Sequence, residues 1–434
     1  MNKKVGIGLG IALCIGVIAT YFTYQQNKQV TLTFALFSDS YWDAPNANSY
    51  KIVDDVIARF EKEHKNVNVT YVSGLQKRDY SEWLSQQALQ KKLPDVFVVN
   101  PNDLSIFSGV GMLENLDSFI EKDKAFKTEA YFTPALQAGV INKKQYALPY
   151  ESVPTLMYVN KTLLEKEGIL VPSNTWTWED FYNISKQVTK DINKDGNLDQ
   201  FGFYGYTWEN AVASNKGSIF NAEKNMATLD NSNVQEAIEF TRKLERLNKG
   251  QTLTSKLFDK GQVAFCPMRF SEYRTYKPYP WRVKKYANFE WECIPMPAGP
   301  QGNNVSQLDT LLMGMSKKSA HKDLAWEFLK MLTYDKTTQK DIFAYSQGVS
   351  VLKDITSSDT VIKYLKEDTP GEGAFKLDFF NDTMEHAMSV HKFNDYDQVM
   401  SLADSEIRRF LNTDEDVKAT MHALQTKLDM ILKK

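Results

Sequence analysis

The sequence predicts an α/β protein with two lobes, and three observations lead to that prediction. The chain has 434 residues, of which 42% are hydrophobic, and this is more than one hydrophobic core usually serves. Segments in which apolar residues have the spacing of a strand alternate with segments in which they have the spacing of a helix. This alternation starts again near residue 145. No low-complexity linker or tandem repeat interrupts the chain, so we expect short, ordered hinge strands between the lobes.

The first lobe is predicted from an order of strand, helix, strand, helix and strand. The strands are expected at 31–37, 67–72 and 94–100, and the helices at 48–66 and 79–92. This order is typical of a parallel sheet, whose strand ends form the edge where open α/β folds bind ligands. The side chains expected at that edge are Phe37, Asp39, Tyr41, Trp42, Asn100 and Asn102.

The second lobe is predicted from a similar pattern. Strand-like segments at 145–150 and 155–160 precede a helix at 161–168. A further helix begins near Thr177, which can cap it, while Glu179 and Asp180 suit its first turn. Amphipathic helices are expected later in the chain at 319–333 and 416–434.

The first 29 residues predict export and membrane attachment. Lys3 and Lys4 precede an uncharged, mostly apolar run at 5–22. Positive charges hold the start of such a run in the cytoplasm, so the remainder of the chain would lie outside the membrane. An uncleaved N-terminal anchor is the leading interpretation. Simple secretion and lipidation at Cys14 stay open, although Leu13 stands where a lipoprotein box has a small residue.

Charge and cysteine content exclude some classes of protein. The chain carries 52 basic and 54 acidic residues, so no basic field favours a nucleic-acid partner. Cys266 and Cys293 alone lie in the exported part, which excludes a disulfide framework. We expect two buried thiols, and one bridge between them stays open.

The segment TKDINKDGNLDQFG places oxygen-bearing side chains at alternate positions, as in the first nine positions of an EF-hand. Position 12 of such a loop would be a bidentate Glu, but it is Gly202 here. Our leading interpretation is a structural calcium site that pins the loop. A metal-free turn is the alternative, because Asn and Asp also favour turns. The candidate ligands are Asp191, Asn193, Asp195, Asn197 and Asp199, with Gly196 at the turn.

Nothing in the sequence supports a catalytic site. The five histidines lie in no Ser, Cys or carboxylate motif, and His386 and His391 miss the spacing of a zinc pair on a helix. Aromatic residues make up 12% of the chain and gather near predicted loops. Flat rings beside polar side chains are typical of a carbohydrate cleft, where rings stack on the apolar faces of sugars.

The chain resembles the extracellular solute-binding proteins of bacterial carbohydrate ABC transporters, the group that includes maltose-binding proteins. Six segments carry the resemblance in the order of that family, over roughly residues 30 to 345. They are PDVFVVNPNDLSIFSGVGMLENLDSFI, ALPYESVPTLMYVNKTLLEKEGI, VPSNTWTWEDF, DINKDGNLDQFGF, IPMPAGPQG and AWEFLKMLT.

The resemblance implies a two-lobed periplasmic-binding-protein-like fold of type II, in which hinged lobes close on a sugar and present the closed form to a permease. Catalysis is not implied, and we expect a monomer. We place the first lobe at 30–145 plus 300–340 and the second at 146–299 plus 341–434, after the anchor and spacer at 1–29. The six edge residues would line one wall of the cleft, and the candidates on the opposite wall are Glu151, Trp208, Arg269 and Gln347.

One departure from the family pattern concerns Met268 and Arg269, which stand where a small residue usually lets backbone approach the sugar. Arg gives a planar, bidentate match to carboxylate, so one hypothesis is that Arg269 binds an acidic sugar such as a uronate. The alternative is an Arg269 that pairs with a carboxylate of the protein.

The function expected from these observations is capture of an oligosaccharide outside a Gram-positive type of membrane and its delivery to an ABC permease. A solute-binding protein for a non-sugar solute, a surface glycan-active enzyme and an adhesin or sensor remain as rivals.

Overall fold

The structure is a computed structural model that describes residues 29–39, 49–72, 74–221, 226–272, 289–368, 377–389, 393 and 395–433. The predicted anchor and spacer at 1–29 therefore lie outside the described residues, except for residue 29. Tyr41 and Trp42 also lie outside them. Within these ranges no helix is long and apolar enough to span a membrane.

Strands of the described residues form one nine-stranded sheet and two short hairpins. The strands are β1 (Val30–Ala35), β2 (Val67–Val72), β3 (Val96–Val99), β4 (Val140–Ile141), β5 (Lys144–Gln145), β6 (Ala147–Asn160), β7 (Phe201–Phe203), β8 (Phe220–Asn221), β9 (Met226–Ala227), β10 (Val263–Arg269), β11 (Trp291–Ile294), β12 (Gln307–Met315) and β13 (Met388–Ser389). The large sheet has the order β2-β1-β3-β12-β6-β10-β7, with β11 paired to β6 and β13 paired to β12. β1 is parallel to both β2 and β3, which confirms the predicted parallel arrangement of the first lobe.

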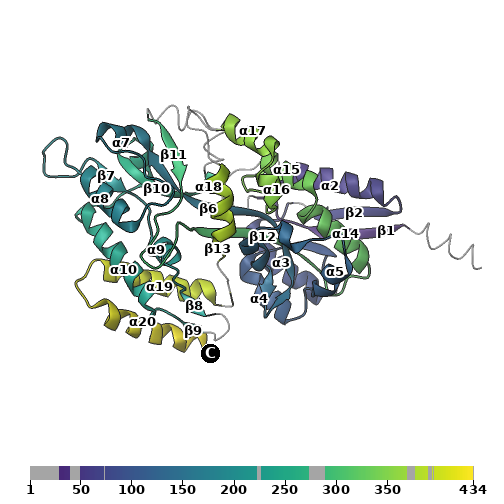
Figure 1. Cartoon of the computed structure of the whole chain (residues 1–434). Coiled ribbons are helices and arrows are strands. Elements are labelled where there is room, and N and C mark those ends of the chain that lie inside the picture. The colour runs from purple at the N-terminus through teal and green to yellow at the C-terminus, as the bar shows by residue number, and fades with distance from the viewer. Residues whose placement is uncertain are drawn as a thin grey trace, which may run out of the picture.

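Helices cover this sheet along its whole length (Figure 1). In the first part of the chain they are α2 (Ser49–Glu63), α3 (Lys77–Leu89), α4 (Pro101–Gly109), α5 (Asp117–Lys122), α6 (Thr133–Gln137), α7 (Lys161–Lys166), α8 (Trp178–Val188) and α9 (Trp208–Ser214). They continue with α10 (Ser232–Glu245), α11 (Ser255–Asp259), α14 (Lys322–Thr333), α15 (Lys336–Tyr345), α16 (Lys353–Thr356), α17 (Asp359–Asp368), α18 (Leu377–His386), α19 (Tyr396–Leu411) and α20 (Val417–Leu432).

The predicted start of α8 is confirmed by its capping geometry. The Thr177 hydroxyl accepts a hydrogen bond of 3.2 Å from the Asp180 amide, and the Asp180 carboxylate accepts one of 2.8 Å from the Thr177 amide. This reciprocal arrangement satisfies two amides that the first helical turn leaves without partners.

One long strand, β6, joins the two lobes. Its residues 147–154 pair with β12, and its residues 155–160 pair with β10 on one edge and β11 on the other. The sequence predicted two separate strands here, but the structure joins them into one. Every residue of β6 except Thr155 is buried, as expected for a strand covered on both faces.

Two hydrophobic clusters form the cores, and residues of β6 belong to both. The first includes Phe34 and Phe97, and the second includes Phe181 and Ile407. The predicted division grouped all of 341–434 with the second lobe, but Ile342 and the other core residues between 342 and 387 belong to the first cluster. The reason is that α15 packs on α2 and α14, whereas α19 and α20 pack in the second core. The other lobe boundaries stay a prediction.

The two cysteines among the described residues lie on opposite edges of β6. Cys266 and Cys293 both pair with Tyr158, one from β10 and the other from β11. Two strand spacings, about 9.5 Å, separate such positions, and a disulfide requires Cα atoms closer than about 7 Å. Both are therefore free thiols, and burial raises the pKa of each.

Candidate functional site

Polar side chains from distant segments meet where the two lobes adjoin. Nδ2 of Asn102, on the first turn of α4, donates a hydrogen bond of 2.7 Å to Oδ2 of Asp397, on the first turn of α19. Nε of Arg269, at the end of β10, lies 3.4 Å from Oδ2 of Asp309 on β12. We call these four residues, together with Tyr396, the lobe junction.

Tyr396 brings an aromatic ring to the lobe junction. Its ring centroid lies 5.8 Å from that of Phe220 and 5.4 Å from that of Phe393, in edge-to-face contacts. Burial raises the pKa of the Tyr396 hydroxyl, and the charges of Glu209, Asp309 and Asp397 raise it further. The hydroxyl is therefore a neutral group among carboxylates at neutral pH.

Asn100 and Asn102, two of the predicted edge residues, lie at the start of α4. Nδ2 of Asn100 donates to the Ser81 hydroxyl over 2.9 Å, and that hydroxyl donates to Asp103. Burial raises the pKa of Asp103, although bonds from Ser81 and Asn100 act in the opposite direction. Among the described residues, Oδ1 of each of the two asparagines is buried without a hydrogen-bond partner. These oxygens are acceptors that a hydroxylated solute could satisfy.

Phe37 and Asp39, the remaining described residues of the predicted first wall, have structural contacts. Phe37 is 5% exposed, and its ring packs edge-on against Tyr80 with centroids 5.4 Å apart. Asp39 accepts a hydrogen bond of 2.6 Å from the Lys77 amide and so holds the first turn of α3.

Trp208 and Glu151, predicted for the opposite wall, are almost entirely buried. Trp208 is 1% exposed, and its Nε1 donates a hydrogen bond of 3.0 Å to Asp404. Glu151 lies in the part of β6 that pairs with β12, is 5% exposed, and accepts a hydrogen bond from the Ser346 hydroxyl. Gln347, which follows Ser346 in the chain, is 9% exposed. A flat ring that is buried in this way offers no open face for stacking on a sugar.

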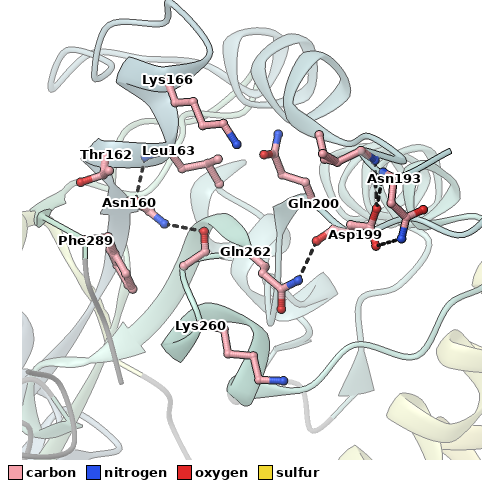
Figure 2. A pocket seen from close by; sticks show the side chains of 12 residues that line it. Asn160, Thr162, Leu163, Lys166, Asn193, Asp199, Gln200, Lys260, Gln262 and Phe289 are labelled. Carbon is pink, nitrogen blue, oxygen red and sulfur yellow. Dashed lines mark hydrogen bonds between the residues drawn. The ribbon is translucent and has the colours of Figure 1, made fainter. Parts of the chain in front are cut away.

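The loop of predicted calcium ligands folds back on itself around its carboxylates. Asp199 accepts hydrogen bonds from the Ile192 and Asn193 amides at 2.9 and 3.1 Å and from Nδ2 of Asn193 at 3.2 Å (Figure 2). Asp191 accepts from the Asp195 and Gly196 amides at 3.2 and 2.8 Å. In the part of the chain that the structure describes, no three or more His, Cys, Asp or Glu side chains are grouped to hold a metal ion. The calcium site therefore stays a prediction.

Comparison with known proteins decides the family. The sequence profile of the bacterial extracellular solute-binding proteins matches residues 43–339.

The chain belongs to the bacterial extracellular solute-binding proteins.

This solute-binding protein is also similar to individual characterised proteins. It is 23% identical, over 324 residues and 72% of both chains, to the galactooligosaccharide-binding protein of Bacillus subtilis (strain 168). Its fold matches the cyclic alpha-maltosyl-1,6-maltose binding protein of Arthrobacter globiformis with a TM-score of 0.77 at 16% identity, covering 93% of this chain and 99% of that one. The sugar-binding protein MalE of Xanthomonas citri gives a TM-score of 0.75 at 16% identity, covering 93% and 98%. The predicted two-lobed fold is thereby confirmed.

In this solute-binding protein, the position of Arg269 agrees with the alternative interpretation, in which its side chain pairs with a carboxylate of the protein. Its Nε faces Asp309, and its backbone amide donates a hydrogen bond of 2.7 Å to Glu272. The sequence did not nominate Tyr396, Asp397, Asp309 or Phe220. Their positions are up to 177 residues apart in the chain, so no local pattern could group them.

Proposed function

We propose that this protein is the substrate-binding component of an ABC importer that captures an oligosaccharide outside the membrane and delivers it to the permease. The observation that carries the proposal is the family match over residues 43–339. The similarity to a galactooligosaccharide-binding protein, and to proteins whose names give glycans as ligands, supports the oligosaccharide as the solute.

The lobe junction supplies chemistry that suits such a ligand. Tyr396 and Phe220 offer aromatic surface that is only partly buried, and Asn102 and Asp397 offer amide and carboxylate groups. Rings pack on the apolar faces of sugars while polar groups bond the hydroxyls. The predicted residues Asn100, Asn102 and Arg269 stay candidates, and Asp309, Tyr396 and Asp397 are added to them.

Lobe closure about β6 is the proposed mechanism of capture. β6 runs continuously from the first lobe to the second. In addition, Asn102 of the first lobe contacts Asp397 of the second. A ligand that bonds both sides binds the closed form more tightly than the open form and shifts the population toward it. No chemical step is part of this proposal, because binding and release alone transfer the solute.

A glycan panel tests the proposal. Purified full-length protein would be melted with galactooligosaccharides, maltooligosaccharides and uronate oligosaccharides, and each glycan would be analysed afterwards. A higher Tm with an unaltered glycan is expected, since a ligand that binds only the folded state stabilises it. A cleaved glycan would favour the glycan-active enzyme, and the absence of a Tm shift with every glycan of the panel would overturn the proposal.

Three further features are proposed with this function. We propose that calcium occupies the loop from Asp191 to Asp199, supported by its alternating oxygen side chains and by the amides that orient Asp191 and Asp199. We also propose that the N-terminal segment attaches the protein to the outer face of the cytoplasmic membrane, uncleaved or lipidated at Cys14, and that the protein is a monomer.

A further inference from the structure

A cavity of about 430 Å³ lies at the end of the second lobe, apart from the lobe junction. It is formed by the end of β6, by α7, by the start of β10 and by the loop that holds Asp199 (Figure 2). Figure 1 shows α7 and β7 at the end of the molecule opposite to β1 and β2. The volume is in the range of small-molecule sites.

Hydrogen bonds fix the frame of this cavity. The side chain of Asn160 accepts a bond of 2.9 Å from the Leu163 amide and donates one of 3.1 Å to the Gly261 carbonyl, so it ties α7 to the turn before β10. Nε2 of Gln262 donates a bond of 3.0 Å to the Asp199 carbonyl and ties the start of β10 to the loop. Because both ties come from within the lobe, the cavity keeps its shape without a movement of the hinge.

The walls of the cavity carry both acceptors and donors. Gln200 uses its Nε2 for bonds to Glu167 and the Val188 carbonyl, at 2.8 and 2.7 Å, which leaves its oxygen as an acceptor. Gln262 likewise uses its nitrogen, so its oxygen is a second acceptor. The ring of Phe289 lines the same cavity and adds apolar surface to it. Amide groups beside one aromatic ring suit a hydroxylated ring compound.

Two lysines give the cavity a positive charge. Lys166 and Lys260 both line it and are exposed, and in the described part of the chain neither forms an ion pair. Figure 2 shows Lys166 extending toward Gln200 from α7, with Lys260 on the opposite side. Of the acids in this region, Asp199 accepts three hydrogen bonds and Glu167 bonds Lys190 and Gln200, and the two lysines outnumber the one carboxylate of the lining, Asp199.

We propose that this cavity is a second binding site, separate from the lobe junction, and that it takes a monosaccharide-sized hydroxylated acid of the uronate type. Lys166 and Lys260 attract the carboxylate, the oxygens of Gln200 and Gln262 accept from hydroxyls, and Phe289 contacts the apolar face of the ring. This site goes beyond the proposed oligosaccharide function and does not depend on it.

The test uses full-length protein with isotope-labelled isoleucine methyl groups and D-galacturonate as the probe. Ile192 lines the cavity and is 50% exposed, so its methyl resonance should shift as the probe is added. Ile184 on α8 does not line the cavity, and its resonance should stay in place. A neutral probe, D-galactose, should bind more weakly because it lacks the charge.

The variant Lys166→Gln/Lys260→Gln should weaken D-galacturonate binding roughly threefold to tenfold, as expected for two exposed charge contacts. The matched control, Lys186→Gln/Lys256→Gln, removes the same charge outside the cavity and should bind as the wild type does. Equal binding of galactose and galacturonate, equal binding by the two double variants, or no shift of the Ile192 resonance would each overturn the proposal. Failure here leaves the Tm results with neutral oligosaccharides untouched, because those glycans lack the charge that this cavity requires.

Discussion

Asn102 and Asp397 are 295 positions apart in the sequence, yet a hydrogen bond of 2.7 Å joins Nδ2 of the first to Oδ2 of the second. Asn102 belongs to α4, whose Leu104 is part of the first core, and Asp397 belongs to α19, whose Val399 is part of the second. The bond therefore connects the two lobes directly.

A double-mutant cycle on this bond should show coupling between the lobes. Asn102→Ala and Asp397→Ala should each lower the free energy of unfolding, and the double variant should lose less than the sum. We expect a coupling of about 0.5–1.5 kcal/mol, the usual contribution of one hydrogen bond. Urea unfolding of the four proteins measures it. Additive losses would mean that the contact contributes nothing to stability.

Trp208→Phe should destabilise the fold more than it changes affinity for a glycan. The variant loses the hydrogen bond from Nε1 to Asp404 and leaves space in a fully buried site. We expect a loss of about 2–4 kcal/mol in the free energy of unfolding. Trp83→Phe is the control, since that ring is only partly buried. A large loss of affinity at unchanged stability would instead restore Trp208 as a ligand residue.

Asp199→Asn should abolish the response to calcium. The carboxylate of Asp199 accepts two backbone amides and one side-chain amide, so it holds the loop and would also contribute to the ion site. Calcium should raise the Tm of the wild type, chelator should reverse this rise, and the variant should respond to neither. Asp359→Asn on α17 removes the same charge elsewhere and should keep the response. A calcium response in the Asp199 variant would place the ion at other residues.

Lys330→Met should lower stability at pH 7 and lose this effect in acid. Burial acts to raise the pKa of Asp123, but bonds from Lys330, Trp326 and the Ala125 amide outweigh it and hold the pKa below its usual value. A carboxylate whose pKa is lowered in the folded state stabilises the fold at pH values above its pKa in the unfolded chain, which is about 3.9. This stabilisation disappears as the pH falls through the lower pKa of the folded state.

We therefore expect a difference of about 1–2 kcal/mol between wild type and Lys330→Met at pH 7. It should shrink steadily below about pH 4, where the unfolded carboxyl is protonated. Unfolding by urea at a series of pH values measures it, with Lys340→Met on the exposed side of α15 as the control. A difference that stays constant down to pH 2 would show that Lys330 acts through packing alone.

Cys266 and Cys293 should remain reduced in the folded protein and react slowly. Their positions on opposite edges of β6 keep them apart, and burial raises the pKa of both thiols, so little thiolate is available. Alkylation followed by mass spectrometry should label both only after denaturation. A peptide pair joined by a disulfide after mild oxidation would contradict the strand order in this sheet.

Local sequence determined much of the fold. The alternation of strands and helices predicted β1, α2, β2, α3 and β3 because each depends on a short period of apolar side chains. Thr177, with Glu179 and Asp180 in the first turn, predicted the start of α8 because a helix cap depends only on residues a few positions apart. The six segments that resemble the family likewise keep their order along the chain.

Only the tertiary structure decided which distant residues meet. The continuity of β6, the assignment of 342–387 to the first core and the pairing of Arg269 with Asp309 all depend on contacts between elements far apart in sequence. The lobe junction and the cavity beside α7 arise in the same way. Periodicity records which face of an element is buried, but it carries no information about the element that covers that face, and this is why the candidate site had to be read from the packed structure.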